Sequence, residues 1–236
     1  MRRDSTEIPA PGSAPLPPCE LRAGAPERSG RRRVLFYGDS NTYGTNPAQG
    51  RAGRYPEEVR WTGRLSRALE GEWTVLEDSG PGRCIPELDF ERARLFESLR
   101  SHAPLDLLAV MLGTNDHLSL GRPDCGAVGA KMARFLRDLR REDSPLPPGT
   151  PVLVIAPPYL DFHADRWYRP YDTRNGSLSR ALGRAAEERL TEDRNLRFLD
   201  AGGWDLPLCG DGIHLSAEGH RILAERLAAY FQSGDL

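Results

Sequence analysis

The chain has 236 residues, of which 39% are hydrophobic and 28% are charged, as in an ordinary soluble globular protein. Its formal net charge of −2 excludes a general electrostatic attraction to nucleic acid or to an anionic membrane. No apolar run is long enough to span a bilayer, and the four cysteines lack the spacing of a metal site. We therefore expect a cytoplasmic protein with free thiols and with no metal or organic cofactor.

Residues 1–32 are rich in proline, alanine, glycine and serine, and they cannot bury enough apolar surface to offset the entropy of ordering. We predict a disordered tail over 1–32 and one folded domain over 33–236. No apolar region follows Met1, so no secretory signal is expected. The arginines at 31–33 are interpreted as a solvated charge run rather than as a docking site for an anionic partner.

After the tail, short apolar runs alternate with longer segments of helical periodicity. Strands are predicted at 33–38, 73–76, 105–112, 151–156 and 196–199. Helices are predicted at 57–70, 86–101, 126–141, 177–192 and 216–231, the second of them opened by Pro86. This alternation favours right-handed crossovers, and so an α/β fold, a three-layer α/β/α sandwich with a five-stranded parallel sheet.

Four loops that follow predicted strands hold the chain's most unusual polar and glycine-rich stretches: 39–44, 79–84, 113–117 and 201–214. Because parallel strands end at one edge of the sheet, we expect these loops to meet there, where open α/β sheets bind ligands. The segment 159–174 contains five aromatic residues and is predicted to be irregular. Its function is not indicated by the sequence.

Ser40 follows the first predicted strand and lies between Gly38 and Gly44. Such a turn places the serine hydroxyl at the carboxyl end of the sheet. The same stretch is equally typical of an ordinary strand-to-helix turn, in which Asp39, Ser40 or Asn41 caps the helix.

Asp211 precedes His214 by three residues, with Gly212 between them. A carboxylate at this spacing can accept a hydrogen bond from the imidazole and fix its tautomer. The alternative is a surface pair at a helix start, with Ser216 as the N-cap. The predicted sheet edge favours the first interpretation, because a serine is a weak nucleophile until a base takes its proton. We therefore interpret Ser40 as a nucleophile, His214 as its base and Asp211 as the residue that orients the base.

Acyl transfer also needs hydrogen-bond donors for a developing oxyanion. The backbone N–H groups of Ser40 and Gly82 and the side-chain amide of Asn115 are the candidates. Taken singly, Gly82 is also typical of a simple turn, and Asn115 of an Asx turn or cap.

Together these stretches resemble the SGNH (GDSL-type) hydrolases. The four matching blocks are Gly38–Asn41, the turn at Gly82, Gly113–Asp116 and Asp211–His214. The resemblance covers residues 33–231 and implies a flavodoxin-like catalytic domain with Ser40, Asp211 and His214 as the triad. It also implies Ser40, Gly82 and Asn115 as the oxyanion hole, and no metal.

Within that family the sequence is most similar to the bacterial arylesterase/perhydrolase branch, through residues 38–44, 54–56, 59–63, 111–116 and 211–220. It departs from the branch at Pro81 and Cys84, where an asparagine and a threonine are usual. The resemblance makes a homo-oligomer plausible. We place Asp39, Tyr43, Trp61 and Arg83 at the substrate pocket, although core packing is the alternative for Trp61.

The function expected from this pattern is a serine esterase that hydrolyses small aryl or alkyl esters, with a small-molecule ester as its partner. Three alternatives remain. The same triad also serves thioesterases, lysophospholipases and carbohydrate deacetylases. The acyl group can instead pass to an acceptor other than water, including peroxide. The third alternative is a non-catalytic binding protein on this fold.

Overall fold

The computed structural model describes residues 30–50, 52–120, 122–162, 176–190 and 193–234. From Arg31 onward they belong to one compact unit. Most of the predicted tail, residues 1–32, lies outside the described residues, as does 163–175 of the aromatic-rich segment.

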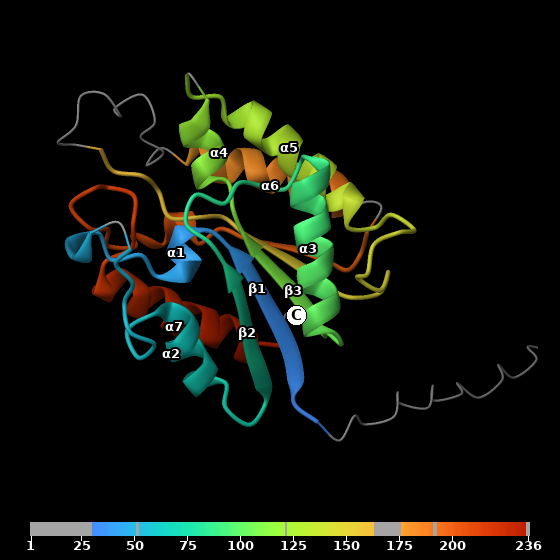
Figure 1. The fold of residues 1–236 in the computed structure, drawn as a ribbon, viewed down its shortest axis with the longest axis horizontal. Coiled ribbons are helices and arrows are strands. Elements are labelled where there is room, and N and C mark those ends of the chain that lie inside the picture. The colour runs from blue at the N-terminus through green and yellow to red at the C-terminus, as the bar shows by residue number, and fades with distance from the viewer. Residues whose placement is uncertain (1–29, 51, 121, 163–175, 191–192, 235–236) are drawn as a thin grey trace, which may run out of the picture. The chain divides into compact units, whose positions relative to one another are not determined.

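The described residues form a sheet of five parallel strands in the order β2-β1-β3-β4-β5 (Figure 1). The strands are β1 (Arg32–Gly38), β2 (Trp73–Ser79), β3 (Leu107–Met111), β4 (Val152–Ile155) and β5 (Leu196–Leu199). The chain first places β2 on one side of β1 and then places β3 on the other. This reversal makes the carboxyl ends of β1 and β3 the topological switch point, where such sheets form a ligand crevice.

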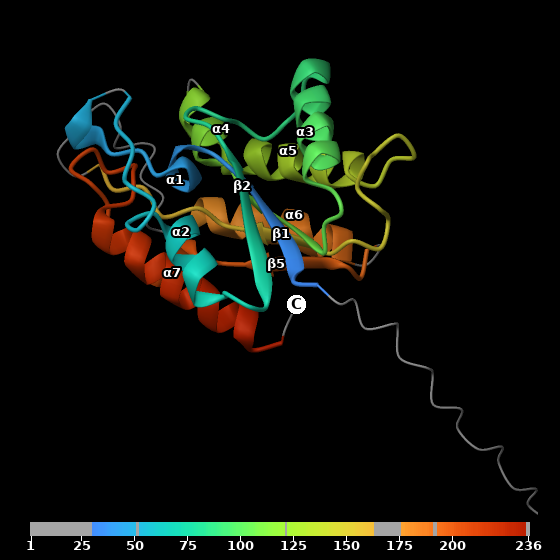
Figure 2. The same ribbon diagram turned by 60° about the horizontal axis from the view of Figure 1, so that its bottom comes forward.

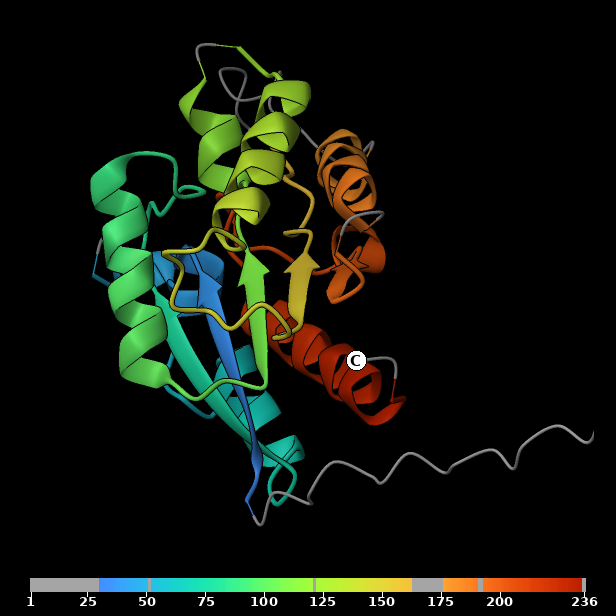
Figure 3. The same cartoon turned by 90° about the vertical axis from the view of Figure 1, so that its right-hand side faces the viewer.

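Helices cover both faces of the sheet, which confirms the predicted three-layer α/β/α sandwich (Figures 1 and 2). One face carries α2 (Trp61–Ala68) and α7 (Ala217–Gln232). The other carries α3 (Asp89–His102), α5 (Cys125–Asp138) and α6 (Ser177–Leu190), which Figure 3 shows from the side. None of the described helices has the length and apolar character needed to cross a membrane.

Side chains of β1 alternate between two hydrophobic cores. Val34 and Phe36 pack in the core under α2 and α7, whereas Leu35 and Tyr37 pack in the core under α3, α5 and α6. A strand buried on both faces must be apolar throughout, which explains the continuous runs in the sequence.

Several element boundaries differ from the prediction. The helix predicted from residue 57 begins at Trp61, because Val59 and Arg60 close a turn back onto Pro56. Pro86 does not open α3, which begins at Asp89. Leu88 is the N-cap residue, and its backbone N–H donates to the Glu91 carboxylate. The short helices α1 (Ser40–Tyr43) and α4 (Thr114–Ser119), and the 3₁₀ turns η1 (Pro47–Gln49) and η3 (Gly202–Trp204), occupy segments predicted as loops.

Candidate active site

The structure brings Ser40, His214 and Asp211 into one hydrogen-bonded chain at the carboxyl edge of the sheet. Ser40 Oγ lies 3.0 Å from His214 Nε2, and His214 Nδ1 lies 2.6 Å from Asp211 Oδ2. Ser40 starts α1 directly after β1, whereas the other two precede α7. The predicted meeting of distant loops is therefore confirmed, and the arrangement can carry a proton from a serine hydroxyl to an imidazole.

Asp211 is held in place by its own loop. Its Oδ1 accepts the backbone N–H groups of Ile213 and His214, each at 3.0 Å. Burial alone would raise the pKa of Asp211, but the hydrogen bonds from the His214 side chain and from these two backbone groups outweigh it and hold the pKa below its ordinary value. The carboxylate thus stays ionised and can stabilise an imidazolium at His214.

Asn41 joins the turn of Ser40 to the loop of His214, a role that the sequence did not reveal. Its Oδ1 accepts the N–H of Leu215 at 2.8 Å, and its Nδ2 donates to the carbonyl of Ile213 at 3.1 Å. The two bonds bracket His214 from a side chain adjacent to Ser40. The only signal in the sequence was a short amide side chain directly after the serine.

An Asn41→Ala variant is expected to be less stable and less active. It leaves the Ile213 carbonyl and the buried Leu215 N–H without partners, at a cost of about 1–3 kcal/mol for each group. Urea unfolding and kcat measured on the same preparation test this. The control is Asn46→Ala, because the Asn46 side chain accepts a hydrogen bond from Ala48 within its own turn. Equal losses in both variants would contradict the bridging role.

Gly212 lets the loop that carries Asp211 and His214 pass against the backbone of Asp161. The Asp161 N–H donates to the Gly212 carbonyl at 2.9 Å, and a Cβ on Gly212 would lie 1.8 Å from the Asp161 carbonyl oxygen. The φ of Gly212 is +68°, a conformation that favours glycine. A side chain at this position would therefore displace the loop that carries Asp211 and His214.

The three predicted oxyanion donors follow three neighbouring strands: Ser40 starts α1 after β1, Gly82 lies in the turn after β2, and Asn115 lies in α4 after β3. The Asn115 side-chain amide donates to the carbonyl of Arg83 at 3.0 Å, next to Gly82. Gly82 is exposed, with φ at +77°, and a Cβ there would meet nothing within 4 Å. Their role as an oxyanion hole stays a prediction.

Two residues assigned to the substrate pocket from the sequence lie in the interior instead. Trp61 is 0% exposed, and its indole N–H donates to the carbonyl of Asn41 at 3.0 Å. Asp39 is 1% exposed and caps α1 by accepting the N–H of Asn41 at 2.9 Å. Burial raises the pKa of Asp39 to about 6, although the hydrogen bond from Asn41 opposes the shift. Both residues support α1 and have no surface to offer a substrate.

The other two pocket candidates, Arg83 and Tyr43, are partly exposed. The Arg83 guanidinium donates to the Asp78 carboxylate at 2.7 Å and stacks over the ring of Tyr37 at 4.1 Å, so it fastens the end of β2. The ring of Tyr43 lies 4.1 Å from the Arg54 guanidinium. Substrate binding by Tyr43 and Arg83 stays a prediction.

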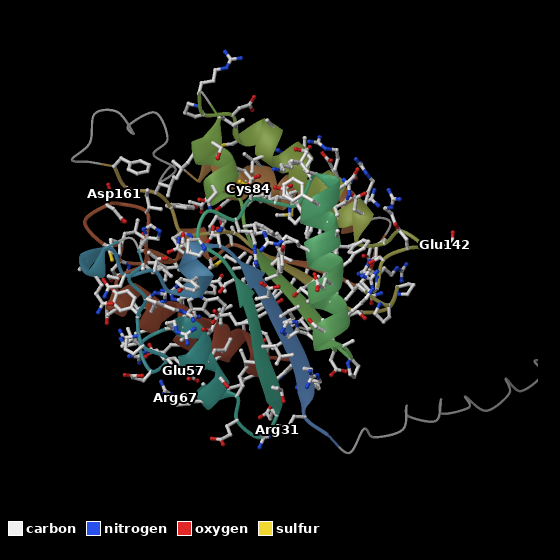
Figure 4. All side chains as sticks on the ribbon, in the orientation of Figure 1. Arg31, Glu57, Arg67, Cys84, Glu142 and Asp161 are labelled. Carbon is white, nitrogen blue, oxygen red and sulfur yellow. The ribbon has the colours of Figure 1, made fainter. Side chains whose placement is uncertain are left out.

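A cavity of about 370 Å³ adjoins the loop that carries Asp211 and His214. Its lining includes Tyr159, Asp161, Asp205, Cys209 and Gly212. Figure 4 labels Asp161 at this edge of the sheet. Among the residues that the structure describes, no group of three or more histidine, cysteine or acidic side chains is arranged to hold a metal ion.

Comparison with known proteins identifies the family of this chain. The model of the GDSL-like lipase/acylhydrolase family matches residues 36–222. Est24, a carbohydrate acetylesterase from Sinorhizobium meliloti, is 29% identical, with a TM-score of 0.68 over 86% of this chain and 99% of that one. The aryl esterase of M. smegmatis is 28% identical, with a TM-score of 0.70 over 86% of this chain and 99% of that one. The salicylyl-acyltransferase SsfX3 shares the fold, at 20% identity and a TM-score of 0.58 over 88% of this chain and 56% of that one. No curated protein sequence matches.

Proposed function

Since the chain belongs to the GDSL-like lipase/acylhydrolase family and is an ester-hydrolysing enzyme, we propose that it is a serine esterase for small acyl esters. The observation that carries this proposal is the unbroken chain from Ser40 Oγ through His214 to Asp211, at 3.0 and 2.6 Å. The first link has a length suited to proton transfer from a serine to a histidine base, and the second suits a carboxylate that orients the imidazole.

In the first half of the reaction, His214 Nε2 takes the Ser40 proton while Oγ attacks the ester carbonyl. The imidazolium forms with its Nδ1–H directed at the ionised Asp211 carboxylate, which stabilises the positive charge. The negative charge on the carbonyl oxygen develops toward the N–H groups of Ser40 and Gly82 and the Asn115 amide. His214 then gives its proton to the departing alcohol, which leaves an acyl group on Ser40.

In the second half, water enters and the same groups act again. His214 takes a proton from the water as its oxygen attacks the acyl carbon. The tetrahedral intermediate collapses, the carboxylic acid leaves, and His214 returns the proton to Ser40 Oγ. One water molecule is consumed for each ester cleaved, and Ser40 and His214 end in the states in which they began.

The direct test compares the hydrolysis of p-nitrophenyl acetate, butyrate and octanoate by the wild type and by Ser40→Ala. We expect turnover that falls with acyl length and is lost in the variant, and a fluorophosphonate label on Ser40 found by mass spectrometry. Ser101→Ala, on the surface helix α3, is the control and should behave as wild type. No turnover and no label on a folded wild-type protein would contradict the proposal.

A second candidate is the deacetylation of an acetylated sugar. The cavity beside Gly212 has an aromatic residue, Tyr159, and two acidic residues, Asp161 and Asp205, in its lining. A ring can pack on the apolar face of a sugar, and a carboxylate only accepts hydrogen bonds, which suits hydroxyl donors. The similar structure Est24 is named as a carbohydrate acetylesterase. A higher kcat/KM for acetylated sugars than for p-nitrophenyl acetate would favour this candidate, and the reverse order would exclude it.

A further inference from the structure

The segment that contains Gly82 is fastened to α4 at two points. Asn115 donates its side-chain amide to the carbonyl of Arg83 at 3.0 Å, and Asp116 Oδ2 accepts the backbone N–H of Ile85 at 2.9 Å. Two successive residues of α4 therefore hold both sides of Cys84, which Figure 4 labels near that helix. The position of the Gly82 N–H depends on these attachments.

The second attachment contains a buried charge. Asp116 is 6% exposed, and its other oxygen, Oδ1, lies 2.8 Å from the ammonium of Lys131 on α5. Lys131 is the only lysine of the sequence, and its side chain is 19% exposed. A buried carboxylate without a cation is costly, because desolvation favours its neutral form.

The pKa values of the pair agree with this geometry. Burial raises the pKa of Asp116, and the nearby Lys131 ammonium and the hydrogen bond from the Ile85 N–H oppose that shift. Burial would lower the pKa of Lys131, but the ion pair with Asp116 outweighs burial and raises it. Glu87 is farther from the ammonium, at 3.8 Å, and it also pairs with Arg134 at 2.5 Å. Asp116 is thus the closer partner of Lys131.

We propose that Lys131 is a positioning residue for the oxyanion hole. Its ammonium holds the Asp116 carboxylate in the orientation that accepts the Ile85 N–H, and this fixes the loop that presents Gly82. Lys131 touches no reacting atom and acts through Asp116 alone. This role rests on the proposed esterase function.

The test compares Lys131→Met with Arg134→Met, which removes a cation one turn further along α5. Arg134 pairs with the exposed side of Glu87 rather than with Asp116. We expect Lys131→Met to lower kcat by about 10- to 100-fold, because a misplaced donor stabilises the transition state less. KM should stay within about twofold, because ground-state binding is retained. Arg134→Met should keep wild-type kcat.

A double variant, Asp116→Asn with Lys131→Met, distinguishes two effects of the ammonium. One is the positioning of the Gly82 loop through Asp116, and the other is direct electrostatic stabilisation of the oxyanion. The asparagine carbonyl can still accept the Ile85 N–H, and no charge is left buried. We expect kcat to recover most of the way to wild type. A double variant as slow as Lys131→Met, or an Arg134→Met variant that is equally slow, would overturn the proposal.

Amide hydrogen exchange supplies a readout that does not depend on turnover. Exchange in residues 82–85 should be faster in Lys131→Met than in the wild type and unchanged in Arg134→Met. Unaltered exchange in Lys131→Met would refute the positioning role even if the enzyme hydrolysed no ester tested. If the wild type took no fluorophosphonate label while exchange was altered in Lys131→Met, the result would count against the esterase function alone.

Discussion

An Asp211→Asn variant is expected to fold normally and to lose about 10⁴-fold of kcat. In the wild type, the backbone N–H groups of Ile213 and His214 donate to Asp211 Oδ1. In the variant they determine which atom of the asparagine amide takes the place of Oδ1. They are donors, so the amide oxygen must face them. The amide NH₂ is then left facing His214 Nδ1.

A donor at that position reverses the tautomer of His214. Nδ1 has to accept a hydrogen bond, so the proton moves to Nε2, the nitrogen that lies 3.0 Å from Ser40 Oγ. An Nε2–H cannot take the serine proton, and the base is lost without a change of shape. The expected loss of kcat therefore follows from the two backbone hydrogen bonds to residue 211, neither of which involves the substrate.

Steady-state kcat with p-nitrophenyl acetate and the thermal unfolding midpoint test this expectation. Asp143→Asn, at an exposed carboxylate paired with Arg141, is the matched control and should leave both quantities unchanged. A fall in kcat of less than about tenfold in Asp211→Asn would mean that His214 does not rely on Asp211 for its tautomer.

Replacing Asn115 with alanine is expected to lower kcat by about 10²–10³-fold, the usual cost of one oxyanion donor. The variant also frees the carbonyl of Arg83, so the neighbouring Gly82 donor loses one of its two attachments to α4. KM should change much less than kcat, because a developing charge is present only in the transition state.

Ser119→Ala is the control for Asn115→Ala. Ser119 belongs to the same short helix, and its hydroxyl donates to the Asn115 carbonyl at 2.6 Å, so its loss perturbs α4 without removing the amide. When kcat is measured for the three alanine variants, the loss should be largest for Ser40→Ala, smaller for Asn115→Ala and smallest for Ser119→Ala. If Asn115→Ala kept wild-type kcat, Asn115 would have no part in the oxyanion hole.

The sheet could be predicted because its strands are buried on both faces. Runs such as Leu107–Met111 must then be apolar at every position, and no other arrangement explains them as simply. The loops that carry the candidate triad could also be predicted, since parallel strands end at one edge. In contrast, α1 and α4 have only 4 and 6 residues, which is too short for a helical period to show.

The supports of the site could not be predicted, because their partners are backbone groups far away in the chain. Asn41 binds the carbonyl of a residue 172 positions later, and Asp116 binds an N–H 31 positions earlier. No spacing rule connects such groups. Lys131 lies in a helix with many surface charges, so its pairing with a buried acid has no distinct pattern in the sequence. For Trp61 the sequence left both a pocket wall and core packing open, since a large aromatic beside a site suits either, and the structure buries it.

The separation of Ser40 from His214 by 174 residues has a consequence during synthesis. Ser40, the proposed nucleophile, leaves the ribosome with β1, but His214, its proposed base, comes just before α7, the last described helix, which packs in the same core as α2. A chain is synthesised from its N-terminus, and a domain generally folds as a unit. Under the proposed mechanism, Ser40 therefore remains an ordinary alcohol until His214 has been synthesised and α7 has docked, and a chain cut before His214 should hydrolyse no ester.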